Sequence, residues 1–168
     1  SLQEVNSNSI SLASSLSFVE GATFYSVNNQ QPSVQWSNFV DKRLDFTGIM
    51  ATNNNGSYAI GNLTLNSVYQ NGNLISEDSW PAVSGPWGNG PLENGWYDAS
   101  RRQNPFNGQG FVRDGVGFFI ETLPSFNTGR DELYIHPDQV PYFGTSGCIG
   151  LQCDATRLNA FWSVMDTY

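Results

Sequence analysis

Charged residues are scarce in this chain, and the scarcity excludes some classes of partner. Only 13% of the 168 residues are charged, the net charge is −8, and Lys42 is the only lysine. Nucleic-acid binding needs a basic surface that neutralises phosphates, so we expect no nucleic-acid partner. No stretch approaches the roughly 18 apolar residues of a membrane-spanning helix, so we also expect no membrane span.

Histidine and cysteine are rare as well, and they lie close together in the sequence. His136 is the only histidine, and it precedes Cys148, one of two cysteines, by twelve positions. An imidazole can take the proton of a thiol and so activate it as a nucleophile. His136 and Cys148 are therefore candidate base and nucleophile for acyl transfer, a chemistry that needs no metal and no organic cofactor. The alternative is a buried free cysteine beside an unrelated surface histidine.

The second cysteine leaves another alternative open. Cys148 and Cys153 could form a disulfide across a tight loop, which would abolish the nucleophile and indicate an oxidising compartment. The chain would then be a non-catalytic β-sandwich that binds a glycan or a protein.

Glycine, proline, asparagine and serine are abundant, and they favour many turns and short strands. The 17 glycines and eight prolines, with 39% hydrophobic residues, predict a mainly β domain. Asn71-Gly72 predicts a type I′ hairpin turn between a strand ending at Tyr69 and one starting at Leu74. The segment Trp80–Leu92 is rich in Gly and Pro and is expected to be a loop. The other expected strands are Thr23–Val27, Val34–Phe39, Leu44–Met50 (strand or loop edge), Tyr58–Ile60, Leu63–Tyr69, Gly95–Ala99, Val116–Thr122 with Gly117 as a candidate bulge, and Leu133–His136.

The C-terminal segment has a different pattern. Asp154 can cap a helix from Ala155 to about Met165. Its apolar residues recur at helical spacing, which predicts a face that packs on the core. These residues are Leu158, Phe161, Trp162 and Met165.

The loop before Cys148 has features that acyl transfer requires. Gly147 lets the main chain approach a substrate carbonyl without interference from a Cβ atom. The N–H groups of Gly147 and Cys148 could form an oxyanion hole. Asp138 either orients the imidazole of His136 or closes a turn after Pro137, and the turn is slightly favoured.

These motifs resemble the L,D-transpeptidase (YkuD-like) catalytic domain. That family has a histidine, a variable spacer and Ser/Thr-X-Gly-Cys followed by an apolar residue, which Thr145-Ser146-Gly147-Cys148-Ile149 matches. Upstream, Gln70–Leu74, Pro81–Gly85 and Gly90–Tyr97 occur in the family's order. The divergent branch found among toxins delivered by type VI secretion is the most similar. The resemblance covers about Gly61 to Leu151, and implies a β-sandwich with a short C-terminal helix.

The chain departs from the family at two positions. Ser146 replaces a second histidine, whose role is then vacant or taken by a hydroxyl or a main-chain carbonyl. Gly150 replaces an arginine that can hold a substrate carboxylate, for which Arg130, Arg102 or Arg113 are candidate substitutes. The expected substrate-binding residues are Tyr134, Thr145, Arg130 and Trp87. Tyr134, Tyr142 and Phe143 either line the pocket or fill the core, and packing is the favoured role for Trp87 and Trp96.

The resemblance implies a division of the chain and a reaction. Residues 61–168 would be the catalytic domain, and residues 1–60 a β-rich extension of unknown role packed on it. Cys148 would form a thioester with a peptidoglycan stem tetrapeptide, with His136 as base and with Ser146, Gly147 and Asp138 around them. Hydrolysis is favoured over exchange or cross-linking, and a catalytically dead relative is the alternative. The implied location is the bacterial periplasm or cell wall, reached by secretion or delivery, with a cognate inhibitor (immunity) protein as a further partner.

Overall fold

The chain folds into a mainly β structure with one C-terminal helix, as the sequence predicts. The computed structural model describes residues 8–12, 39–69, 71–99 and 101–167. One mixed sheet has the strand order β10-β5-β1-β2-β3-β4-β12-β11-β9-β6, and β7 and β8 pair separately. The elements are β1 (Asn8–Leu12), β2 (Phe39–Asn53), β3 (Gly56–Tyr69), β4 (Leu74–Ser84), β5 (Trp96–Asp98), β6 (Arg102–Gln103), β7 (Val112–Arg113), β8 (Val116–Gly117), β9 (Phe119–Glu121), β10 (Leu123–Pro124), β11 (Tyr134–Pro137), β12 (Ile149–Leu151) and α3 (Ala155–Met165).

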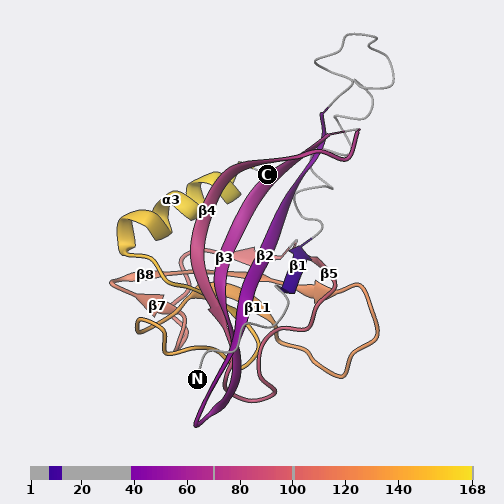
Figure 1. Ribbon diagram of the computed structural model, residues 1–168. Helices are drawn as coiled ribbons and strands as arrows, with labels where there is room; N and C mark the ends of the chain where they lie inside the picture. The colour runs from indigo at the N-terminus through magenta and orange to yellow at the C-terminus, as the bar shows by residue number, and fades with distance from the viewer. Residues whose placement is uncertain (1–7, 13–38, 70, 100, 168) are drawn as a thin grey trace.

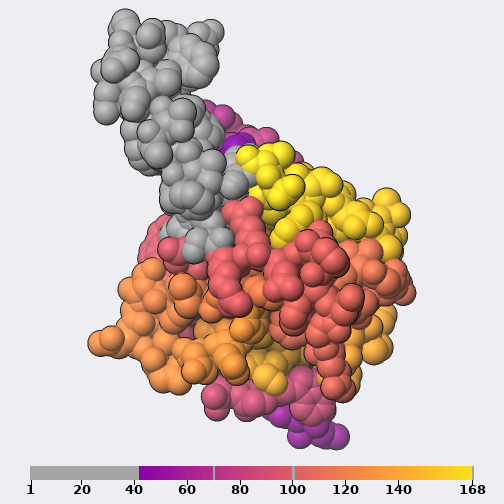
Figure 2. Space-filling view, turned by 180° about the vertical axis from the view of Figure 1, so that it is seen from behind, coloured from indigo at the N-terminus to yellow at the C-terminus, as the bar shows by residue number. Residues whose placement is uncertain are grey.

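Three long antiparallel strands, β2, β3 and β4, form the centre of the sheet. They run side by side and bend along their length (Figure 1). The expected strand Leu44–Met50 lies within β2, and Tyr58–Ile60 and Leu63–Tyr69 are parts of the single strand β3. Viewed from behind, the segments that follow β4 cover this face of the molecule, and the β2–β3 hairpin emerges at their lower edge (Figure 2).

The hairpin between β3 and β4 forms as predicted, but its turn differs. Gly72 has a positive φ of 84°. The main-chain hydrogen bonds of the turn run to Tyr69, one residue further out than a two-residue type I′ turn at Asn71-Gly72 requires, so that prediction was wrong. Gly72 N–H donates to Tyr69 O at 2.9 Å, and Tyr69 N–H donates to Asn73 O at 3.0 Å. These bonds close a three-residue loop in which Gly72 takes the left-handed position.

The segment predicted as a loop over Trp80–Leu92 begins as a strand. β4 continues to Ser84, and the loop starts at Gly85, whose φ is 82°. The strand persists because β12 supplies a second partner, with Ser84 opposite Ile149. Pro81 is tolerated because it is exposed, and its carbonyl accepts a hydrogen bond from Gln152 N–H at 2.8 Å.

The expected strand Val116–Thr122 is divided in two. Val116–Gly117 pairs with β7, and Phe119–Glu121 joins the main sheet. At Gly117 a Cβ atom would lie 2.1 Å from Phe106 O, so a close main-chain contact explains the glycine. The strands predicted at Gly95–Ala99 and Leu133–His136 are present as β5 and β11, each shifted or shortened by a residue.

Helix α3 packs against β4 and closes the core. Asp154 caps it by accepting a hydrogen bond from Arg157 N–H, as predicted. Phe161 is fully buried and meets the ring of Trp80 edge-on at 4.9 Å and the ring of Phe118 at 5.7 Å. Leu158 and Met165 are buried beside it, so the predicted apolar face is core packing.

The N-terminal expectations are only partly covered by the described residues. Thr23–Val27 and all of Val34–Phe39 except Phe39 lie outside them. The boundary proposed between residues 60 and 61 falls inside β3, which pairs with β2 along its whole length. In the part of the chain that the structure describes, no helix is long and apolar enough to cross a membrane.

Candidate active site

Strands β11 and β12 bring the predicted base and nucleophile together. The two strands are parallel, with Ile135 opposite Ile149 and His136 opposite Gly150. Cys148 directly precedes β12 and so lies beside Tyr134, whose N–H points at Cys148 Sγ over 3.3 Å. His136 follows two residues along β11, on the same face of the strand as Tyr134.

A cavity of about 430 Å³ lies over this face. Its lining includes six of the predicted site residues, namely Cys148, His136, Ser146, Tyr134, Thr145 and Trp87. Of the other three, Gly147 and Asp138 are chain neighbours of lining residues, and Arg130 packs against Gly147. The remaining lining residues are Gly110, Phe111, Glu132, Gln139, Phe143 and Gly144.

Two main-chain groups near the start of β11 contact the thiol of Cys148. Besides accepting from Tyr134 N–H, Sγ donates to Glu132 O over 3.7 Å. Burial raises the pKa of Cys148 to about 11, although the Tyr134 N–H and the nearby Arg130 cation favour the thiolate. At rest the group is therefore a neutral thiol, and no hydrogen bond joins it to His136 among the described residues.

His136 is oriented by a main-chain carbonyl. Its Nδ1 lies 2.7 Å from Pro137 O, and because a carbonyl only accepts, Nδ1 carries the proton and Nε2 is left as the base. The ring stacks on Phe111, with centroids 4.1 Å apart. Burial lowers the pKa of His136 to about 4, which keeps the imidazole neutral at physiological pH.

The loop 145–148 leaves two main-chain donors without an acceptor among the described residues. Gly147 has a φ of 110°, a region that side chains disfavour. The N–H groups of Gly147 and Cys148 donate to no acceptor among the described residues. They are therefore free to bind an oxyanion beside the thiol.

Thr145 lines the cavity and also stabilises this loop. Its hydroxyl donates to Cys148 O at 2.5 Å and accepts from Gly85 N–H at 3.1 Å. With both contacts made inside the protein, the hydroxyl fixes the Cys148 loop to the loop after β4.

Arg130 is likewise engaged with main chain, and it does not line the cavity. It donates to Pro91 O at 2.8 Å and to Gly90 O at 3.2 Å. A Cβ atom at Gly147 would lie 2.4 Å from Arg130 Nη2, so the guanidinium packs directly against the loop. Arg102 donates to Met165 O instead, and neither it nor Arg113 lines the cavity. The expected arginine anchor for a substrate carboxylate is thus not found among the described lining residues.

Asp138 closes a turn, the alternative that the sequence slightly favoured, and does not hold the imidazole. Its buried carboxylate accepts from Gly144 N–H at 2.9 Å and from Gln152 Nε2 at 2.8 Å. Burial raises the pKa of Asp138, against the effect of these hydrogen bonds. Its contribution to the site is to fix the loop between β11 and Cys148.

The space around Gly150 is small, so the absence of the family's arginine there also involves the neighbouring residues. A Cβ atom there would lie 3.0 Å from Thr145 Cγ2 and 3.2 Å from Asp138 Cβ. Since these are the residues that fix the loop, a side chain at position 150 would have to displace them slightly, which favours glycine there.

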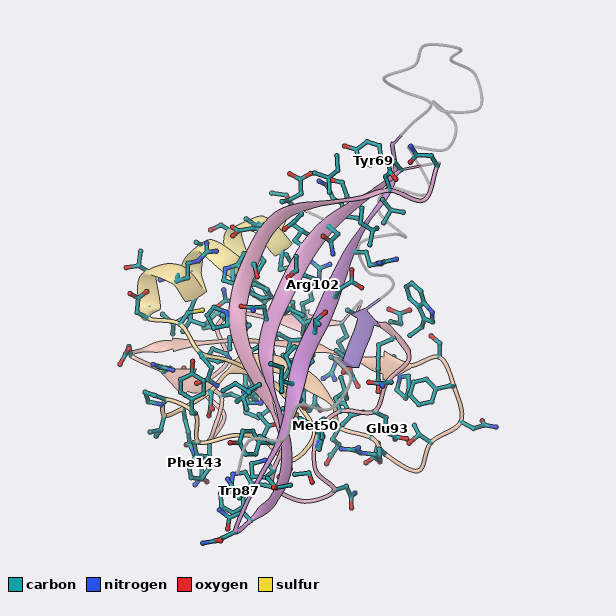
Figure 3. The ribbon with its side chains drawn as sticks, viewed as in Figure 1. Met50, Tyr69, Trp87, Glu93, Arg102 and Phe143 are labelled. Carbon is teal, nitrogen blue, oxygen red and sulfur yellow. The ribbon has the colours of Figure 1, made fainter. Side chains whose placement is uncertain are left out.

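Two aromatic residues form one wall of the cavity. Trp87 Nε1 donates to Phe143 O at 2.9 Å, and the two rings are 5.4 Å apart. Figure 3 shows both at the end of the long strands opposite Tyr69. Of the residues left open between pocket and packing, Trp87, Tyr134 and Phe143 line the cavity, whereas Tyr142 lines a separate one of about 290 Å³.

Sequence reasoning missed two lining residues that matter chemically, Phe111 and Glu132. Phe111 stacks on His136 from a segment 25 positions earlier, and no local pattern marks it. Glu132 has a φ of 53°, a conformation that a sequence without a glycine or asparagine there does not reveal.

The site is a thiol site without a metal cluster. Cys148 and Cys153 are both free and buried, so the disulfide of the alternative reading is not formed. Within the described ranges, no group of three or more His, Cys, Asp or Glu side chains could hold a metal ion.

Comparisons with protein-family models, with curated proteins and with solved structures give no match to this chain.

Proposed function

We propose that this chain is a cysteine-dependent acyl-transfer enzyme that acts on peptidoglycan stem tetrapeptides, with an L,D-transpeptidase-like β-sandwich fold. One observation carries the proposal. Cys148 and His136, the scarce residues of the motif, line one cavity from adjacent parallel strands, beside the unpaired N–H groups of Gly147 and Cys148. A thiol, a neutral imidazole and an oxyanion hole together are the minimum set for thioester chemistry.

The reaction begins with a proton transfer. The thiol leaves its contact with Glu132 O by rotation about χ1, and Nε2 of His136 takes its proton as sulfur attacks the carbonyl of the L-centre of the third residue. The N–H groups of Gly147 and Cys148 bind the oxyanion. The terminal D-residue leaves with the proton from His136, and a thioester to Cys148 remains.

Water or an amine then resolves the thioester. The attacking water or amine gives a proton to His136. His136 passes that proton to the sulfur of Cys148 when the thioester bond breaks. Water releases a tripeptide, a D-amino acid gives an exchanged peptide, and a second stem gives a 3–3 cross-link. We favour the hydrolytic outcome, which makes the enzyme an L,D-carboxypeptidase of the periplasm or cell wall.

The test is turnover of purified disaccharide tetrapeptide followed by mass spectrometry. Cys148→Ala and His136→Ala should each lower turnover about 1,000-fold or more while circular dichroism is unchanged. Cys153→Ala is the matched control, because Cys153 is also a free buried thiol but does not line the cavity. If wild-type protein yields no tripeptide, exchanged peptide or cross-linked dimer, or if Cys148→Ala retains turnover, the proposal fails.

A further inference from the structure

Phe111 covers one face of the His136 ring. The two rings are stacked, with centroids 4.1 Å apart and planes inclined by 18°. The imidazole has a second contact in its own plane, the 2.7 Å hydrogen bond between Nδ1 and Pro137 O. A contact on the face and a contact at the edge together fix the rotamer of the histidine side chain.

The Phe111 ring is itself held in place by the fold. Phe111 directly precedes β7, which packs against β11. Its N–H donates to Gly108 O at 3.0 Å. Its ring meets the rings of Phe106 and Tyr134 edge-on, with centroids 5.2 Å and 5.6 Å away. The position of the ring over His136 therefore does not depend on the stacking contact alone.

The cover over the ring face favours the neutral imidazole. Burial lowers the pKa of His136 to about 4, although the hydrogen bond to Pro137 O has the opposite effect. Phe111 also lines the cavity, so without its side chain the cavity would extend over the face of the imidazole. An imidazolium ion would then be hydrated and would form more readily. An aromatic face also attracts a cation, but burial has the larger effect here, since the pKa of His136 is lowered.

Burial, and no neighbouring charge, is the main cause of this lowered pKa. Among the described residues, no charged side chain is hydrogen-bonded to His136. The titratable side chains on β11, on the elements that pack against it and in the cavity lining are Tyr134, Asp138, Cys148, Glu121, Glu132 and Arg113.

We propose that Phe111 is a positioning residue for the base: its ring holds the His136 imidazole in one orientation and keeps solvent from one of its faces, so that the base stays unprotonated and active in mildly acidic solution. The catalytic consequence rests on the proposed function, whereas the effect on the imidazole does not.

Nuclear magnetic resonance of the ¹⁵N-labelled protein tests the effect on the imidazole without any substrate. His136 is the only histidine, so its ring signals need no further assignment. In wild type the ring should titrate near pH 4, with the proton of the neutral form on Nδ1. Phe111→Ala should raise the proton affinity of the ring about tenfold or more, because the exposed imidazolium is hydrated.

Phe143→Ala is the matched control. Phe143 also lines the cavity, but its ring packs against Trp87. The control should leave the proton affinity of His136 within about twofold of wild type. An unchanged titration in Phe111→Ala, or an equal rise in Phe143→Ala, overturns the proposal.

The fold of each variant is checked by the dispersion of its methyl signals, since the histidine of an unfolded chain also titrates near pH 6.5. If Phe111→Ala does not fold, Phe111→Leu takes its place. Leucine covers part of the ring face, so the expected rise in proton affinity is about threefold, and an unchanged titration again overturns the proposal.

A second arm measures kcat/KM for the tetrapeptide at pH 5 and at pH 8. The ratio of the two values should be about tenfold lower in Phe111→Ala than in wild type, because the uncovered base is protonated at pH 5. This ratio cancels any loss of activity that does not depend on pH. An unchanged ratio, together with a raised proton affinity, overturns the catalytic role of Phe111. If wild type does not turn over the peptide, the proposed function fails, and the titration still decides what Phe111 does to the imidazole.

Discussion

At the scale of single residues, the hydrogen-bond partners of a side chain decide its role in the site. The scarcity of His136 and Cys148 and the motif around them made both predictable from the sequence. The turn that Asp138 closes was the slightly favoured alternative, whereas the roles of Thr145 and Arg130 were not predictable, because their polar groups bond to main-chain atoms far away in the sequence. A sequence shows that a side chain can donate or accept, but it does not show which partner it meets.

The resting thiol should react slowly at neutral pH. Because burial raises the pKa of Cys148 to about 11, the thiolate fraction grows about tenfold for each pH unit below that value. Alkylation of Cys148 by iodoacetamide should therefore rise about tenfold per pH unit between pH 7 and 10, as followed by peptide mass mapping. A plateau near pH 7 would instead mean a preformed thiolate–imidazolium pair.

The oxyanion loop should tolerate no side chain at Gly147. An alanine there would adopt a φ of 110°, and its Cβ atom would lie 2.4 Å from Arg130 Nη2. Displacing the Gly147 and Cys148 N–H groups should lower turnover about 100-fold, as the loss of one oxyanion donor does elsewhere. Gly72→Ala is the comparison, since Gly72 has a positive φ but no atom within 4 Å of its Cβ position, and it should retain turnover.

At the scale of elements, periodic segments were easier to predict than strand ends. Helix α3 was found nearly to the residue, because capping and helical spacing are local signals. The extension of β4 over Trp80–Ser84 was missed, since its partner β12 lies more than sixty residues away. Gly117 was predicted as a candidate bulge, but no local pattern shows its close contact with Phe106 O, eleven residues earlier in the chain.

Helix α3 should owe more stability to its buried face than to its cap. Phe161→Ala removes a fully buried ring and should cost about 3–5 kcal/mol. Asp154→Ala removes one capping hydrogen bond and should cost about 1 kcal/mol. Urea unfolding measures both, with Asn159→Ala on the exposed face as a near-neutral control. Equal losses for Phe161→Ala and Asp154→Ala would contradict the packing described for α3.

At the scale of the whole molecule, burying two titratable groups in the cavity links stability to pH in two windows. His136 has a lowered pKa in the folded state, so the unfolded chain binds its proton first as the pH falls. Stability from this group is present above pH 6.5 and is lost as the pH falls toward about 4. Cys148 has a raised pKa, so its contribution is present below pH 9.0 and is lost as the pH rises toward about 11.

The acid window can be isolated with one variant. Between pH 7 and 4.5, wild type should lose about 2 kcal/mol more unfolding free energy than His136→Gln, because the variant has no imidazole to protonate. Glu77 and Asp78 also have lowered pKa values, owing chiefly to hydrogen bonds from Ser67 and Arg157, and their effect cancels in this comparison. Parallel pH curves for the two proteins would show that His136 is not buried in its neutral form.

The parallel pairing of β11 and β12 explains how His136 and Cys148 come together although they are twelve residues apart. Base and nucleophile are held together by strand register, with His136 opposite Gly150, and the loop that joins the strands does not set their separation. Its exposed stretch Gln139–Phe143 can therefore change in length without moving the pair, whereas Gln139 and Phe143 themselves line the cavity. A search for distant relatives should weigh the two strands and let the spacer vary.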